Sequence, residues 1–206
     1  MQNIKPYALL WTASFFAVFI WSASAPKDYL TWALEVSPAV IGFIALAVTR
    51  KSFPLTTLCY SLILFHCWIL MVGGHYTYAE VPLFDTIRDV FNQSRNNYDK
   101  VGHFTQGFVP AIICREIIIR YNIISSKFFT HFFTLCFVLA FSAFYELIEW
   151  GVALLSGEAA DAFLGTQGYI WDTQSDMAWA LFGASSALIL LSPLHNKQIK
   201  LLQTRS

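Results

Sequence analysis

Three pairs of acidic or imidazole side chains stand at helical spacing within or beside long apolar segments of the chain. The pairs are Asp99 with His103, Glu146 with Glu149, and Asp172 with Asp176. On a helix, residues three or four apart lie on one face. Acids and imidazoles presented this way by neighbouring helices form inward-facing metal cages in bundle proteins. Such a ligand set suits Mg, Mn, Fe or Zn and does not choose among them.

The composition places these pairs in a membrane protein. Of 206 residues, 56% are hydrophobic and only 13% are charged, whereas soluble domains carry roughly a quarter charged residues. The formal net charge is zero and there is no long basic run, so nothing suggests a nucleic-acid partner. The four cysteines fall in apolar runs without close metal-ligand spacing, and we expect them to be buried and unpaired.

The hydrophobic pattern predicts an all-α, polytopic bundle of about six transmembrane helices in one integral membrane domain, residues 1–206. A span takes about 20 helical residues. The expected spans are residues 7–24, 29–48, 54–72, 101–119, 128–154 and 170–191. In residues 83–91, between the third and fourth spans, apolar residues recur at helical spacing and mostly polar or charged residues fill the other positions. This pattern predicts a short amphipathic helix on the membrane surface.

The distribution of basic residues predicts which side each loop faces. Eight lie in the two tails and the even-numbered loops: Lys5, Arg50, Lys51, Arg120, Lys127, Lys197, Lys200 and Arg205. Four lie on the opposite side: Lys27, Arg88, Arg95 and Lys100. The positive-inside rule then puts both termini in the cytoplasm of a bacterial cell, with the chain in its inner membrane.

This topology brings the three pairs to one depth. Spans four and six enter from the outside and span five ends there, so all three pairs lie within about 12 Å of the outer boundary at 1.5 Å per residue. His75 closes span three at the same level, and Glu35 lies in the outer half of span two. Arg115 and Glu116, near the inner end of span four, are expected to form an interfacial pair.

So many carboxylates in one layer repel one another and need an opposing charge. A divalent metal ion, bound protons, or basic side chains such as Arg88, Arg95 and Lys100 could each supply it. In the metal interpretation, four residues are the ligands, with His75 a weaker candidate, and Glu146 or Glu149 activates water as a general base. The four ligands are Asp99, His103, Asp172 and Asp176.

Several motifs together resemble the YjdF family of bacterial inner-membrane proteins over nearly the whole chain. They are residues 74–78 (GHYTY), 99–104 (DKVGHF), 145–150 (YELIEW), 164–169 (LGTQGY) and 172–177 (DTQSDM). The resemblance implies an inner-membrane location and carries no mechanism with it.

The last half of the chain is also similar to VanZ-like membrane proteins, which are linked with glycopeptide resistance. Their pattern combines a helix that starts with Asp-Lys-x-x-His-Phe, a helix with Glu and a polar residue three positions later, and a helix with paired Asp positions. In this chain these parts correspond, in the same order, to residues 99–104, 146–149 and 172–176. VanZ-like proteins usually carry an Asn where this chain continues Ala178-Trp179-Ala180, and the His75 region is not part of their pattern. This likeness implies a role in the cell envelope.

Three classes of function are therefore open: a metal-dependent protein acting on an envelope-derived amphiphile or ion, a small proton- or ion-coupled transporter, and a non-catalytic envelope factor. The substrate, the oligomeric state and whether the protein is an enzyme do not follow from the sequence.

Overall fold

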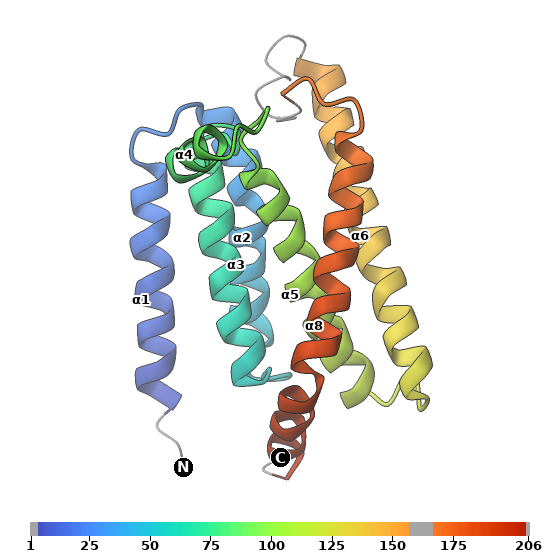
Figure 1. The fold of residues 1–206 in the computed structure, drawn as a ribbon. Helices are drawn as coiled ribbons and strands as arrows, with labels where there is room; N and C mark the ends of the chain where they lie inside the picture. Colours follow the sequence, from blue (N-terminus) through green and yellow to red (C-terminus); the bar gives the residue numbers. More distant parts are fainter. Residues whose placement is uncertain (1–3, 157–166, 205–206) are drawn as a thin grey trace.

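The chain folds into an upright bundle of long helices with one short helix across its end (Figure 1). The structure is a computed structural model that describes residues 4–156 and 167–204. Over these residues the helices are α1 (Ile4–Ala23), α2 (Tyr29–Thr49), α3 (Thr57–His75), α4 (Pro82–Val90), α5 (Tyr98–Arg120), α6 (Lys127–Ser156) and α8 (Asp172–Gln203). The described residues contain no strand, so the predicted all-α class is confirmed.

Four of these helices are long and apolar enough to cross a membrane by length and composition: α2, α3, α6 and α8. Helix α1 adds a shorter apolar helix, Tyr7–Ala23. Helix α5 has 23 residues but is more polar than these, because charged and imidazole side chains interrupt its apolar sequence. Five of those side chains are buried: Asp99, Lys100, His103, Arg115 and Glu116.

Helix α5 is the centre of the bundle. It packs against α3, α6 and α8, while α1 and α2 pack on α3, and Figure 1 shows α5 running between α3 and α8. Because charged side chains facing lipid cost free energy, the most polar of the long helices is the one surrounded by the others. Both ends of the described chain lie at the same end of the bundle. We call the other end, where α5 and α8 begin, the polar end.

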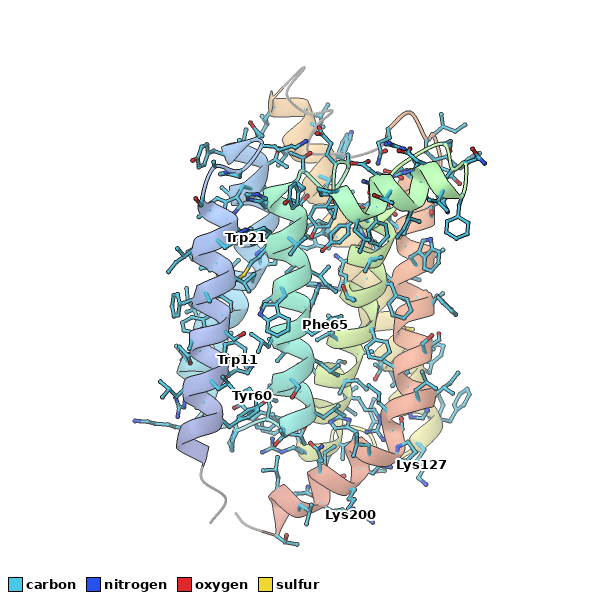
Figure 2. The ribbon with its side chains drawn as sticks, turned by 60° about the vertical axis from the view of Figure 1, so that its left-hand side comes forward. Trp11, Trp21, Tyr60, Phe65, Lys127 and Lys200 are labelled. Atoms are coloured by element: carbon cyan, nitrogen blue, oxygen red, sulfur yellow. The ribbon has the colours of Figure 1, made fainter. Side chains whose placement is uncertain are left out.

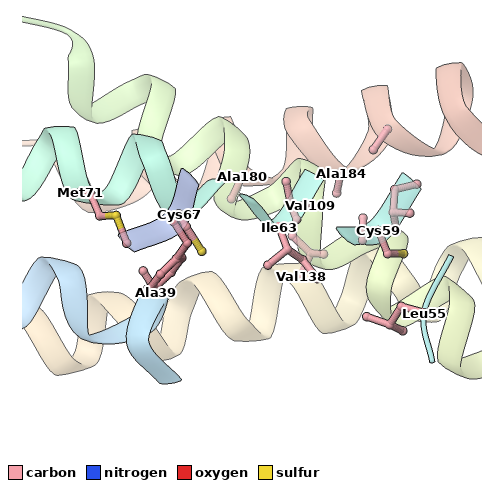
Figure 3. Close-up of a cluster of buried hydrophobic side chains, with 14 of the residues drawn as sticks. Ala39, Leu55, Cys59, Ile63, Cys67, Met71, Val109, Val138, Ala180 and Ala184 are labelled. Atoms are coloured by element: carbon pink, nitrogen blue, oxygen red, sulfur yellow. The ribbon is translucent and has the colours of Figure 1, made fainter. Parts of the chain in front are cut away.

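Small residues allow α5 and α8 to pack with their backbones nearly in contact. A Cβ atom on Gly107 would lie 1.7 Å from the carbonyl oxygen of Ala180, and one on Gly183 would lie 2.0 Å from that of Phe104. Figure 3 shows Ala180 and Ala184 in the same buried cluster as Val109. Close approach through small residues is typical of membrane helices, and here it fixes α5 and α8 as one unit.

Helix α4 lies across the polar end, with none of its residues fully buried. Arg88 pairs with Asp85 and Asp89 on the same helix, and Pro82 occupies its first position, a residue well suited to a helix start. The predicted amphipathic helix therefore forms where it was expected.

The remaining contacts attach α1 and bend α8. Trp11 of α1 donates a hydrogen bond of 2.8 Å to the carbonyl of Tyr60 on α3, and Figure 2 shows the two side by side. Helix α8 continues past the end of the predicted span and turns across the bottom of the bundle near Lys200. Pro193 lies within it, and a proline inside a helix removes a backbone hydrogen bond and kinks it.

The cysteines are free, as expected, but they are not all buried. Cys59 and Cys67 are buried, Cys114 is half-buried and Cys136 is exposed. The prediction was wrong for Cys136 because it assumed that an apolar run is buried in protein, whereas lipid-facing helix surfaces are equally apolar.

Candidate functional site

The start of α5 is held by asparagine and glutamine side chains. The side-chain oxygen of Asn96 accepts a hydrogen bond from the backbone N–H of Tyr98, and its amide donates to the carbonyl of Val81 and to Asp85. Gln167 bonds both the N–H and the carbonyl of Asn96. These bonds satisfy backbone groups that a helix end leaves free and tie the start of α5 to α4 and to the segment before α8.

Three aspartates from α5 and α8 converge around one lysine at the polar end. The Nζ atom of Lys100 lies 2.5 Å from Asp176 Oδ1, 2.8 Å from Asp172 Oδ1 and 3.4 Å from Asp99 Oδ2. Arg95 pairs with Asp172 and lies 3.4 Å from Asp99. All five side chains are buried. We call Asp99, Asp172 and Asp176 the aspartate cluster.

His103 occupies the opposite side of this cluster from Lys100. Its Nε2 atom lies 3.2 Å from Asp99 Oδ1 and 3.8 Å from Asp176 Oδ2, and one ligand atom from each of the three residues lies within 4.8 Å of the others. On the far side of the ring, Nδ1 donates to Gln106 Oε1 at 3.0 Å and lies 3.9 Å from Glu146 Oε1.

This geometry demands a proton or a metal ion between Nε2 of His103 and the two carboxyl groups. An imidazole has two nitrogens, and when Nδ1 carries the proton given to Gln106, the neutral ring presents a lone pair at Nε2. That lone pair would face oxygens of Asp99 and Asp176, which repel it. A second proton on Nε2, a proton held by either carboxyl group, or a metal ion between the three groups removes the repulsion.

Below His103 a narrow cavity of about 200 Å³ extends between α2, α3, α5 and α6. Its polar lining includes Glu35, Asp99, His103, Tyr145 and Glu149. Tyr145 donates a hydrogen bond of 3.3 Å to Glu35 across the cavity. Deeper in the same cavity lies His66, whose Nε2 is buried without a hydrogen-bond partner among the described residues.

A second, wider pocket of about 680 Å³ lies on the other side of the aspartate cluster. Lys100 and Arg95 line it together with Tyr169, whose ring centroid lies 5.7 Å from the lysine nitrogen and 5.9 Å from the guanidinium carbon. We call it the basic pocket. Asp99 and Asp176 lie between His103, which lines the cavity, and Lys100, which lines the basic pocket, because each turns one oxygen toward Lys100 and the other toward His103. We call these two aspartates the wall.

The charges of this region do not balance among the described residues. Six buried carboxyl side chains surround the cluster and the cavity: Glu35, Asp99, Glu146, Glu149, Asp172 and Asp176. The buried basic side chains facing them are Arg95, Lys100 and His103. Even with His103 protonated, three carboxylates are in excess, and buried like charges are unfavourable without protons or a cation.

The structure brings together most of the residues singled out in the sequence, with two differences. Asp172 is held by the two cations rather than by His103. His75 turns to α1, where its Nδ1 lies 3.0 Å from the carbonyl oxygen of Ser22 and its ring packs on Trp21. The span boundaries predict the depth of His75 but not the rotation of α3 about its axis. Of the proposed neutralising cations, Arg95 and Lys100 reach the cluster, and Arg88 stays on α4.

A second buried polar cluster at the opposite end was not expected. Glu116 accepts hydrogen bonds from the N–H and hydroxyl of Thr56, from Cys59 and from Arg120, and lies 2.9 Å from His195 Nε2. The predicted pair of Arg115 with Glu116 was wrong. Adjacent residues on a helix point in different directions, and Arg115 binds Nδ1 of His195 and Asn196 instead.

Although Cys59, Glu116 and His195 are close enough together to hold a metal ion, their hydrogen bonds argue otherwise. Arginine only donates, so Nδ1 of His195 must accept from Arg115 at 2.9 Å. The proton then sits on Nε2 and points at Glu116, and no lone pair is left there for a metal. This cluster ties α3, α5 and α8 together. The signal for it in the sequence was a charged pair, Arg115 with Glu116, inside the apolar second half of α5.

The fold and the site together define a polytopic helical membrane protein with a buried, ionisable cluster at one end of its bundle. Residues 7–197 match the family described as "Predicted membrane protein (DUF2238)". The chain is 46% identical to "Inner membrane protein YjdF" of Escherichia coli (strain K12) over 200 residues, covering 97% of this chain and 96% of that protein. No solved structure matches.

The chain therefore belongs to the DUF2238 family of membrane proteins, and the resemblance drawn from the sequence motifs is confirmed. Its location in the bacterial inner membrane follows from the same match. Residues 164–166 of one of those motifs lie outside the described residues.

Proposed function

We propose that this membrane protein binds a divalent metal ion between Asp99, His103 and Asp176 and uses it on the polar group of an envelope-derived amphiphile. The observation that carries the proposal is the arrangement of His103, which presents Nε2 to two carboxylate oxygens while donating its other N–H to Gln106. A histidine that binds a metal usually donates its second N–H in this way.

The excess of carboxylates supports the same proposal. A divalent ion would offset two of the surplus negative charges, and it would sit at the oxygens of Asp99 and Asp176 that face His103 rather than Lys100. Asp172 is not among the proposed ligands, since it lies outside the group of three residues whose ligand atoms are within 4.8 Å of one another, and its Oδ1 pairs with Arg95 and Lys100. Its role is to hold those two cations beside the wall.

Two glutamates are placed to handle protons. Glu146 Oε1 is buried without a hydrogen-bond partner among the described residues and lies 3.9 Å from His103 Nδ1. Glu149 lines the cavity. A metal ion would polarise an oxygen of the bound group, and Glu149 in the cavity or Glu146 beside His103 could accept a proton from water as a general base.

The test is metal analysis of the protein purified in detergent, after equilibration with Mg²⁺, Mn²⁺ or Zn²⁺ and removal of free ions. We expect stoichiometric metal in the wild type and its loss in Asp176→Asn and in His103→Gln. Matched controls are Asp89→Asn, an exposed carboxylate on α4, and His131→Gln on α6, which lies outside both polar clusters. Wild-type protein that holds no more metal than the two site variants would overturn the proposal.

A proton at Nε2 satisfies the same geometry, and this favours a second candidate, a proton-coupled carrier. Carboxylates and phenols line the cavity from Asp99 to Glu35 and Tyr145, as in proton relays of membrane transporters. Nitrogen NMR of the histidines separates the two: a protonated His103 shows hydrogen on both ring nitrogens, and a metal-bound one shows it on Nδ1 alone.

A further inference from the structure

The cavity below His103 is long in the direction of the helix axes and changes character along its length. Its lining on α5 extends from Asp99 to Ile113, a distance of about 20 Å at the helical rise of 1.5 Å per residue. All the acidic groups of the lining gather near Asp99 and His103, with the neutral Gln106 and with His66 farther in. Farther along, the wall consists largely of apolar side chains, which include Ile63, Cys67, Val109, Ile113 and Phe141.

This shape suits one chain of a lipid rather than a compact molecule. The cavity has about 200 Å³, less than the roughly 300–1,000 Å³ of pockets that enclose drug-sized ligands. A narrow space with an ionisable end and an apolar remainder is complementary to an amphiphile that inserts a single hydrocarbon chain. The polar group would then lie at Asp99 and His103.

The side of the cavity between α2 and α6 is open to the surroundings. Phe141 of α6 lines the cavity and is nevertheless 39% exposed. Across from it on α2, Gly42 also lines the cavity, and a Cβ atom built there would meet no described atom within 4 Å. Helix α2 packs on α3, whereas α6 packs on α5 and α8. The hydrogen bond from Tyr145 to Glu35 joins α2 to α6 near the polar end.

We infer that α2 and α6 frame a lateral portal through which the hydrocarbon chain of a membrane lipid enters the cavity from the bilayer. The portal lies beside Gly42 and Phe141, and the bond between Tyr145 and Glu35 closes its polar end. This inference rests on the proposed function, since it supplies the route by which an amphiphile reaches the metal site. It names the substrate class as a lipid whose chain, and not only its head group, is bound.

The test uses phosphatidylethanolamine with a photoreactive diazirine in one acyl chain, in nanodiscs containing the full-length protein. After irradiation, mass spectrometry locates the labelled residues. Lipid outside the bundle labels exposed residues such as Leu147, which is 60% exposed. A chain inside the cavity labels Val109, which is 2% exposed. We expect both in the wild type.

The variant Gly42→Phe fills the portal, and we expect it to lose the label at Val109 while keeping that at Leu147. Its matched control is Gly151→Phe, because Gly151 also has no described atom within 4 Å of a built Cβ but does not line the cavity. If Gly42→Phe does not fold, Phe141→Ala widens the opening and is expected to increase the label at Val109. The inference would be overturned if the wild type showed no label at Val109. It would also be overturned if the label at Val109 did not change in Gly42→Phe or, where that variant does not fold, in Phe141→Ala.

Metal content measured on the same samples separates this inference from the proposed function. Metal retained in Gly42→Phe with an unchanged lipid label refutes the portal and leaves the metal site standing. Lipid label at Val109 without metal in the wild type refutes the metal site and supports the portal.

Discussion

Replacing Gly107 by alanine should separate the two helices that build the site. The added Cβ would lie 1.7 Å from the carbonyl oxygen of Ala180, and real Cβ atoms essentially never come closer than 3.0 Å. The neighbouring atom is backbone and cannot rotate away, so α5 and α8 must move apart by at least about 1.3 Å. Overpacking of this kind costs about 3 kcal/mol in the free energy of unfolding.

The assay is thermal unfolding in detergent, followed by tryptophan fluorescence. For a chain of this length, about 3 kcal/mol corresponds to a fall of roughly 6–12 °C in melting temperature. The separation also stretches the distance of 3.8 Å between His103 Nε2 on α5 and Asp176 Oδ2 on α8, so metal binding should weaken in the variant even below its melting temperature.

Two other glycines provide the matched controls. Gly42 and Gly151 lie in α2 and α6 with no described atom within 4 Å of a built Cβ. Alanine at either position should leave the melting temperature unchanged or raise it, since glycine inside a helix costs about 0.5–1 kcal/mol relative to alanine. If Gly107→Ala melts within about 2 °C of the wild type, the close packing of α5 on α8 is wrong.

Three further predictions concern charge and orientation. Lys100→Met should lower the free energy of unfolding by about 3 kcal/mol, because it leaves buried carboxylates unpaired. Its control is Lys27→Met, which breaks an exposed pair and should lower the free energy of unfolding by less than about 1 kcal/mol in the same denaturation assay. Asp28 caps α2 by accepting a hydrogen bond from the N–H of Thr31, which lowers the pKa of its carboxyl group. Asp28→Ala should lower the free energy of unfolding by about 1 kcal/mol at neutral pH. This difference from the wild type should vanish in acid, once Asp28 is protonated in both the folded and the unfolded chain. A fluorescent reporter fused after Ser206 should fold in the cytoplasm, and an alkaline phosphatase fused there should be inactive; the opposite result would reverse the expected topology.

The architecture could be predicted from the sequence because a bilayer permits few alternatives. Backbone groups in lipid must be paired within each segment, so long apolar runs become helices. The ends of the runs also set the depth of each polar residue, and this is why Asp99, His103 and Asp176 could be expected at one level. The structure places them together at the start of α5 and α8. Their role as metal ligands stays a prediction.

The rotation of each helix about its axis could not be predicted in the same way. His75 has the right depth but faces α1, and Asp172 faces the two cations rather than His103. The cluster around Glu116 was missed for a related reason. Its partners Cys59 and His195 lie on α3 and α8, far apart in the chain, and only the packing of three helices brings them into contact.

The shared wall of the two pockets has a consequence for communication between them. Asp99 and Asp176 each divide one negative charge between an oxygen that faces His103 and an oxygen that faces Lys100. A cation that binds from the cavity side attracts the negative charge of both aspartates and weakens their ion pairs with Lys100. Lys100 then interacts more strongly with an anion in the basic pocket. Occupants of opposite charge on the two sides of the wall would therefore favour each other's binding, and by thermodynamic linkage the effect is equal in both directions.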